Sequence, residues 1–146
     1  MAYNLANEYE EPMDKEEVES PQEEQTEPKY NIAYIASCLL DIRDNVHVAH
    51  LQSKSYSEHM ALNDLYENIL GLFDSLVESW QGKYGIVTGY HSPKIQEGVN
   101  IIKYLEFKIE EFVEFGEEQK DTYIKSELDI IVETIYSTLY KLKNLK

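Results

Sequence analysis

The sequence predicts an all-α protein, an up-and-down four-helix bundle that follows a disordered acidic N-terminal tail. Two observations support this fold class. From Lys29 onward, apolar residues recur every three or four positions in four separate stretches, the spacing that places side chains on one face of a helix. Residues 1–28 lack such a stripe and are dominated by acidic side chains. At 146 residues, the chain has the length of one domain with one shared core.

The predicted tail comprises residues 1–28 and carries most of the net charge. It holds ten acidic residues and one lysine, which gives −9 of the total of −15. Three prolines and almost no apolar residues leave too little surface to bury, so folding could not offset the lost chain entropy. We therefore expect a disordered tail over residues 1–28 and a folded bundle over residues 29–146.

The first two helices are predicted on either side of a short turn. Residues 30–51 form the first, with an apolar stripe of Ile32, Ile35, Leu39, Ile42 and Val46. Ser55, followed by Glu58, has the capping-box pattern that opens the second. Its stripe consists of Leu62, Leu65, Ile69, Leu72, Phe73, Leu76 and Trp80. Gly71 lies inside this helix. It either costs about 1 kcal/mol of helix stability or allows a neighbouring helix to approach closely.

The last two helices are predicted after a short link rich in glycine. Ser92 and Pro93 provide an N-cap and a first-turn proline, so the third helix is expected to begin there and to end at Gly116. Its stripe is Ile95, Val99, Ile102, Leu105, Ile109 and Phe112. The fourth helix carries Ile124, Leu128, Ile131, Ile135, Leu139 and Leu142. Four similar stripes joined by short links indicate an up-and-down bundle.

Composition excludes several classes of function. The single cysteine, Cys38, rules out an intrachain disulfide and a cysteine-rich zinc site, and we expect it to be a small buried hydrophobic residue. The acidic net charge argues against nonspecific nucleic-acid binding, which depends on Lys and Arg. No stretch is apolar enough to span a membrane, and no signal peptide is recognisable. A cytoplasmic protein without membrane or nucleic-acid partners is expected.

Three of the four histidines, His47, His50 and His59, lie near the junction of the first two helices. At 100° per residue, His47 flanks the core stripe of the first helix and His50 points toward it. A lateral face of the second helix, off its apolar stripe, carries His59, Asn63, Asp74 and Glu78. The simplest interpretation is a set of helix-end histidines beside a solvated acidic face.

The spacing of these residues resembles the ferroxidase motif of the Dps-like mini-ferritins. In that motif, two histidines twelve residues apart straddle the first interhelical turn, and an Asp-x-x-x-Glu pair follows. His47 and His59 are twelve residues apart, and Asp74 and Glu78 follow with the matching spacing. The resemblance covers about residues 41–78 and implies a ferritin-like bundle with these four residues as metal ligands. A fifth ligand position, Asp in the family, is Asn63 here, and a neutral amide is a weaker ligand.

Helix geometry places such a site between two copies of the chain. His59 and Asp74 would lie about 22 Å apart on one helix, so they cannot ligate the same ion. In a two-fold dimer, His47 and His59 of one copy would face Asp74 and Glu78 of the other. Imidazole and carboxylate ligands suit iron(II), and zinc or another divalent metal could occupy the same groups. The resemblance therefore implies a homo-oligomer that binds iron(II) and could oxidise and store it, with Asn63 weakening any ferroxidase activity.

Some features depart from that family. Val48 replaces the aromatic residue that usually follows the first histidine, and the second link is too short for the family's intervening helix. An acidic tail replaces the basic tail with which some members hold DNA. The size of the oligomer therefore stays open between a dimer, another ring and a twelve-subunit cage. We expect His50 to be a hydrogen-bonded core or interface histidine more often than a ligand, and His91 to be an exposed or helix-capping residue.

Two other functions compete with metal binding. Asn63 favours a non-catalytic structural or assembly protein that kept the fold and part of the ligand set. The net charge of −15 favours an acidic inhibitor or nucleic-acid mimic, although acidic tails usually only solvate, and no partner for the tail is indicated. The chain also looks similar to small proteins of bacterial viruses with a Dps-like core. That similarity implies the host cytoplasm or the virus particle as its location.

Overall fold

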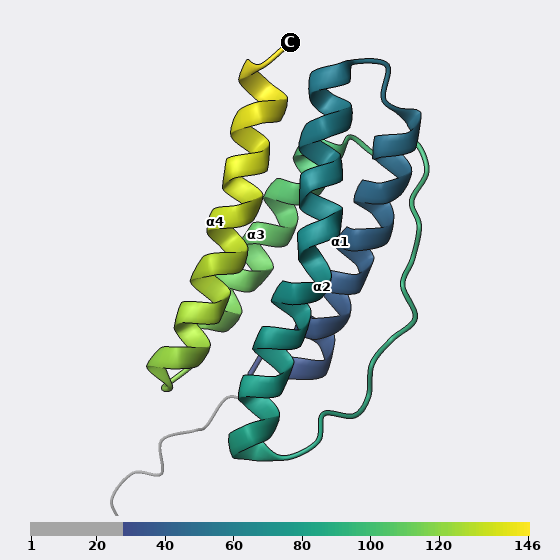
Figure 1. Ribbon diagram of the computed structural model, residues 1–146. Coiled ribbons are helices and arrows are strands. Elements are labelled where there is room, and N and C mark those ends of the chain that lie inside the picture. The colour runs from purple at the N-terminus through teal and green to yellow at the C-terminus, as the bar shows by residue number, and fades with distance from the viewer. Residues whose placement is uncertain (1–27) are drawn as a thin grey trace, which may run out of the picture.

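The computed structural model describes residues 28–146, so the predicted acidic tail, apart from Pro28, lies outside the described residues. Four α-helices make up the described part: α1 (Ile32–Gln52), α2 (Tyr56–Tyr84), α3 (Ile101–Glu117) and α4 (Thr122–Asn144), and no strand occurs between residues 28 and 146. They pack side by side in one bundle (Figure 1). The predicted all-α four-helix fold is confirmed. No helix of the described residues is long and apolar enough to cross a membrane.

Local capping explains where α1, α2 and α3 start. Asn31, Ser55 and Asn100 have extended backbones, and each side-chain oxygen accepts a hydrogen bond from the backbone N–H three residues later. Ser55 therefore opens α2 as predicted, although the Glu58 carboxylate accepts a hydrogen bond from the Ser53 hydroxyl. At the other end of α2, Gly85 has a φ of 91°, a conformation that favours glycine.

Every pair of helices that packs together runs antiparallel. The contacting pairs are α1 with α2, α2 with α4, α4 with α3, and α3 with α1. The start of α2 lies beside the end of α4, where the Ser57 hydroxyl donates to the Leu145 carbonyl, and Lys83 near the end of α2 pairs with Asp121. Consequently α2 and α3 are parallel and lie diagonally opposite. The segment over residues 85–100 crosses the length of the bundle to connect them (Figure 1).

The predicted start of the third helix at Ser92 and Pro93 is wrong, because α3 begins at Ile101 and residues 91–100 are not helical. The reason is the distance that the chain must cover. Residues 99–102 lie beside the α1–α2 corner, which is one α2 length, or about 43 Å, from Gly85. A link that ended at residue 93 would reach only about 28 Å. The short link expected between the second and third helices is therefore a long crossover.

Most residues of the predicted apolar stripes belong to the core. Ile35, Leu39, Ile42, Leu62, Ile69, Leu76, Leu105, Phe112, Ile124, Ile131 and Ile135 are among its buried members. Full burial of one such side chain is worth about 1.5–3 kcal/mol. The exceptions are Ile95 and Val99, which were assigned to the third helix but lie exposed on the crossover.

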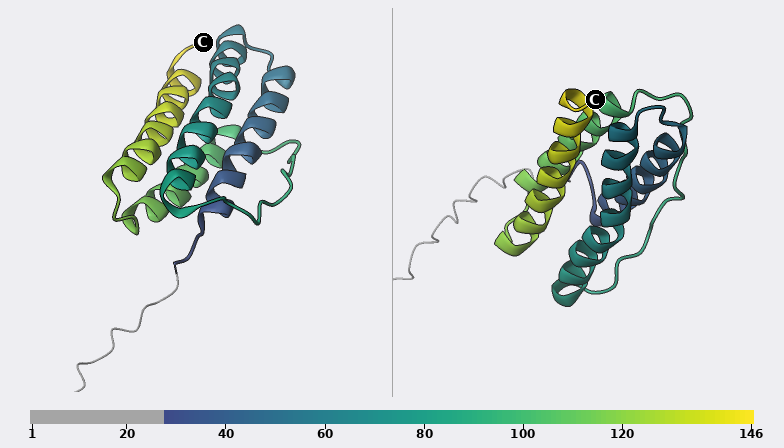
Figure 2. Two further views of the ribbon diagram at one scale, coloured as in Figure 1. Left: turned by 60° about the horizontal axis from the view of Figure 1, so that its bottom comes forward. Right: turned by 45° about the horizontal axis from the view of Figure 1, so that its top comes forward.

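Three polar residues of α1 hold the crossover against the bundle. Ser37 accepts a hydrogen bond from the His91 backbone N–H, and Asp41 Oδ1 accepts one from the Lys94 backbone N–H. Asn45 donates to the carbonyl of Lys94 and accepts from the N–H of residue 96. The crossover therefore runs along the side of α1 that faces away from α4, as all views show (Figures 1 and 2). Since Ser37, Asp41 and Asn45 are four residues apart, they share one helix face.

Candidate functional site

The predicted histidines meet at the corner between α1 and α2. The rings of His50 and His59 stack with their centroids 3.7 Å apart. His50 Nδ1 lies 2.8 Å from the His59 carbonyl, and His59 Nδ1 lies 3.0 Å from the His50 carbonyl. Because a carbonyl only accepts, each Nδ1 carries the proton and donates, which leaves each Nε2 with a free lone pair in the neutral ring. His50 is buried and His59 is half-buried.

His47 and Asn63 belong to the same corner. His47 is exposed and stacks on Tyr66 of α2, with ring centroids 4.2 Å apart. The Tyr66 hydroxyl donates a hydrogen bond of 3.2 Å to Asn63 Oδ1. Within one chain, the amide of Asn63 therefore binds a phenol of its own helix.

The carboxylates Asp74 and Glu78 lie elsewhere on α2, and both are exposed. Because α2 is one helix over Tyr56–Tyr84, His59 and Asp74 are separated by about 22 Å along its axis. One chain therefore does not bring the four predicted ligands together. Whether a second copy does so is not tested by a single chain, and the intersubunit site stays a prediction.

A second polar site, which sequence reasoning missed, lies between α1, α3 and the crossover. Cys38, Asp41 and His91 have one ligand atom each within 4.8 Å of one another, the only such group of three or more among residues 28–146. His91 Nε2 lies 3.7 Å from Asp41 Oδ2. A pocket of about 380 Å³ opens beside Asp41 and His91 and is also lined by Tyr34, Tyr104 and Lys108.

Below this pocket, α3 contributes a buried ion pair. Lys108 Nζ lies 2.7 Å from Glu111 Oε2, and the Tyr34 hydroxyl donates to Glu111 Oε1 at 2.6 Å. Cys38 Sγ lies 3.6 Å from Lys108 Nζ and 3.7 Å from Glu111 Oε2. Every buried side-chain nitrogen and oxygen of the described residues has a hydrogen-bond partner. The polar cluster is therefore compatible with burial, because its groups satisfy one another.

Burial and the neighbouring charges set the pKa values of the Cys38 thiol and the Lys108 ammonium group. It raises the pKa of Cys38 to about 11, against the opposing charge of Lys108. Burial lowers the pKa of Lys108, but the hydrogen bond from its ammonium to Glu111 and the nearby anionic groups outweigh burial, so the pKa is raised overall. At neutral pH, Cys38 is a thiol and Lys108 is charged.

The two tyrosines of the cluster are neutral phenols over the same range. Burial raises the pKa of Tyr34, and its hydrogen bond to Glu111 adds to this. Burial and the Asp41 carboxylate raise the pKa of Tyr104. Neither phenol is arranged to act as a base near neutral pH.

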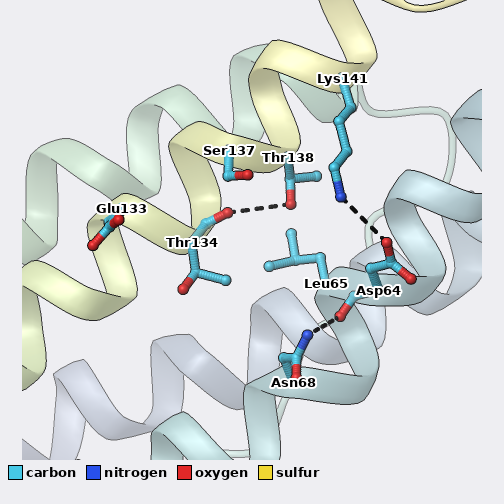
Figure 3. A pocket seen from close by; sticks show the side chains of 8 residues that line it. All are labelled: Asp64, Leu65, Asn68, Glu133, Thr134, Ser137, Thr138 and Lys141. Atoms are coloured by element: carbon cyan, nitrogen blue, oxygen red, sulfur yellow. Dashed lines mark hydrogen bonds and ion pairs between the residues drawn. The ribbon is translucent and has the colours of Figure 1, made fainter.

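A groove between α2 and α4 is also lined by polar side chains, but they do not meet in one cluster as those of the pocket do (Figure 3). It has a volume of about 420 Å³. Lys141 pairs with Asp64 across it at 3.2 Å, and Asn68 donates to the Asp64 carbonyl. It contains none of the histidines, and we assign it no chemistry.

Comparison with known proteins gives one result. The sequence model of a protein family, described as a family of unknown function (DUF5856), matches residues 50–142. The chain belongs to this family. No curated protein and no solved structure matches the chain.

The span matched by the DUF5856 family runs from the last turn of α1 to the last turn of α4. It includes His59, Asp74 and Glu78 of the predicted site, and His91 of the pocket. Cys38 and Asp41 precede it. The matched span therefore covers positions of both sites, and the family's description assigns a role to neither.

The sequence contained a signal for the pocket. On α1, polar side chains recur at positions 34, 38, 41 and 45, and on α3 at positions 104, 108 and 111. Spacings of three and four place each series on one helix face. Lys108 and Glu111 lie off the stripe of Ile109 and Phe112, because neighbouring helix positions are about 100° apart, so spacing did not predict their burial. His91 of the crossover had no periodic signal.

Proposed function

We propose that this protein is a metal-binding bundle of ferritin-like type, related to the Dps-like mini-ferritins, that pairs through the lateral faces of α1 and α2. It binds iron(II) between copies, with His47 and His59 of one copy and Asp74 and Glu78 of the other as ligands. Oxidation of the bound iron, if retained, would be weakened by Asn63, which offers a neutral amide in place of a carboxylate.

The observation that carries this proposal is the arrangement of His59. Its Nδ1 donates to the His50 carbonyl, so the lone pair for a metal belongs to Nε2. Ligating histidines in proteins commonly donate their other ring N–H in this way, which fixes the tautomer and the ring orientation. His47 is exposed on the same corner, so both imidazoles belong to a surface that a second copy can approach.

The lateral face of α2 also supports pairing. Between His59 and Asp74 it presents Leu70, which is 46 % exposed, and Gly71, where an added Cβ would meet nothing within 4 Å. An exposed apolar residue beside a glycine allows two helices to approach closely. The long crossover agrees with the fold type, because ferritin-like bundles have one such connection.

An anaerobic iron(II) titration by calorimetry, with the oligomer mass measured in the same buffer, tests the proposal. We expect two ions per dimer, and loss of both in His59→Ala and in Asp74→Ala. Asp64→Ala is the matched control, because Asp64 is on the same helix but pairs with Lys141. Stoichiometry unchanged by either ligand substitution would contradict the assignment.

A second candidate is a structural bundle without catalysis. The reciprocal hydrogen bonds of His50 and His59 favour it, because they account for both histidines as a clasp between α1 and α2 without an ion. A defined oligomer that binds no iron(II) and does not accelerate its oxidation would support this function. The inhibitor hypothesis rests on the tail outside the described residues and stays a prediction.

A further inference from the structure

Cys38, Asp41 and His91 combine three kinds of metal ligand in one place. Cys38 and Asp41 are one turn apart on α1, and His91 comes from the crossover that covers them. Their ligand atoms lie within 4.8 Å of one another. In a tetrahedral zinc site, bonds of about 2.0–2.3 Å separate neighbouring ligand atoms by about 3.3–3.6 Å. The 3.7 Å between His91 Nε2 and Asp41 Oδ2 is close to that separation.

The other polar atoms of two of these residues are already engaged with the crossover backbone. His91 Nδ1 lies 3.1 Å from the Ser92 carbonyl, so it donates there and leaves the lone pair on Nε2. Asp41 Oδ1 accepts from the Lys94 backbone N–H at 2.9 Å, which leaves Oδ2 facing His91. Ligands in metal sites are oriented by such outer hydrogen bonds. The two free atoms converge because the crossover fixes both side chains.

The charges around Cys38 match a divalent cation. Asp41 and Glu111 are buried carboxylates, and Lys108 is the buried ammonium group of the cluster. With Cys38 as a thiolate, three anions would oppose one cation, an excess of two negative charges that a divalent ion would neutralise.

We propose that Cys38, Asp41 and His91 form a binding site within each chain for one divalent cation of the zinc type. The thiolate and imidazole favour zinc or a similar transition metal over magnesium and calcium, which prefer oxygen ligands. The pocket between α1, α3 and the crossover is lined by Asp41 and His91, so an ion can reach these two ligands and water can act as a fourth. The site would fasten the crossover to α1, and it is independent of the iron site proposed between copies.

Cobalt(II) titration of the full chain, followed by absorption spectroscopy, tests this site. We expect a sulfur-to-cobalt charge-transfer band, which only thiolate ligation produces, and we expect it to saturate at one ion per chain. Cys38→Ser should abolish the band. His91→Ala, which changes only a crossover side chain, should weaken cobalt and zinc binding by more than the roughly 10-fold to 100-fold typical of outer-shell changes. His59→Ala is the control and should leave the band and its stoichiometry unchanged.

Several outcomes would overturn the site. Cobalt bound without a charge-transfer band would exclude Cys38, and binding unchanged in His91→Ala would exclude the crossover histidine. A band lost in His59→Ala would show that thiolate ligation depends on the α1–α2 corner, which would contradict a separate site at Cys38. Because the iron(II) titration depends on His59 and the cobalt band on Cys38, the failure of one proposal leaves the other intact. Should Cys38→Ser fail to fold, His91→Ala alone decides the result.

Discussion

Lys108 and Glu111 form a buried ion pair one turn apart on α3, with 2.7 Å between Nζ and Oε2. Lys108 is 8 % exposed and Glu111 is 4 % exposed. Both also contact Cys38, so the pair connects α3 to α1 at the base of the pocket. Each of these two buried charges is stabilised by the other, because either charge alone would be buried without an opposite charge to pair with.

Glu111→Ala should therefore destabilise the fold strongly, by about 3–5 kcal/mol, because it leaves the Lys108 ammonium buried and unpaired. Chemical denaturation followed by circular dichroism measures the free energy of unfolding. The matched control is Glu114→Ala, which removes the exposed partner of Lys29 and should change stability by no more than about 1 kcal/mol. Equal effects of the two substitutions would refute the role assigned to burial. Replacing Lys108 and Glu111 together by Met and Leu should recover most of the loss.

Stability should fall as pH rises above about 9. The folded chain holds the Cys38 proton to about pH 11, whereas an exposed thiol loses it near pH 9. Between these values the unfolded state binds fewer protons, so the free energy of unfolding decreases by up to about 1.4 kcal/mol per pH unit for this group. Tyr34 and Tyr104, whose pKa values are also raised, extend the decrease to higher pH.

Urea denaturation with a chelator present, repeated from pH 7 to pH 11, checks this dependence. Cys38→Ala should remove the part of the slope between about pH 9 and pH 10, where phenols are still protonated. Tyr104→Phe is the control, because it should reduce the slope only at higher pH. An unchanged slope in Cys38→Ala would rule out the thiol as its source.

Gly71→Ala should stabilise the monomer by about 1 kcal/mol, because Gly71 lies within α2 and an added Cβ meets open space. Thermal unfolding at a concentration where sedimentation shows a monomer measures the effect. Gly85→Ala provides the contrast, since its φ of 91° is strained for any side chain. That substitution should destabilise by roughly 1–3 kcal/mol. A loss of stability in Gly71→Ala would contradict this prediction, because it would mean that another group already contacts this face of α2.

Asn45→Ala should loosen the crossover and destabilise the fold by about 1–3 kcal/mol, because it removes the partners of the Lys94 carbonyl and the Gln96 N–H. Hydrogen exchange at Gln96 reports this directly, and its protection should fall more than the protection of α4. Asn68→Ala is the control, because the Asn68 side chain is exposed and bonds only to its own helix. Unchanged protection at Gln96 would mean that Asn45 does not hold the crossover.

The sequence predicted the bundle well because helix formation in this chain has local signals. The Ser55 cap and the apolar stripes that include Ile69 and Ile131 depend on spacings of three, four and seven residues. The structure confirms the cap and the burial of both isoleucines. The predicted start of the third helix was wrong because Ser92 and Pro93 have the local pattern of a helix N-terminus, which the tertiary structure overrides. The crossover must span the bundle, and its backbone finds partners on α1 instead.

For the candidate sites, too, the sequence predicted the local features and missed the long-range contacts. Spacing alone placed His59 and Asp74 on one lateral face of α2 and too far apart to share an ion within one chain. It could not bring His91 to Asp41, because that contact joins positions fifty residues apart through a segment without periodicity. The sequence by itself determined four amphipathic helices and the faces they present. Only the tertiary structure decided the path of the crossover and its contacts with the polar face of α1, because the crossover itself carries no repeating pattern.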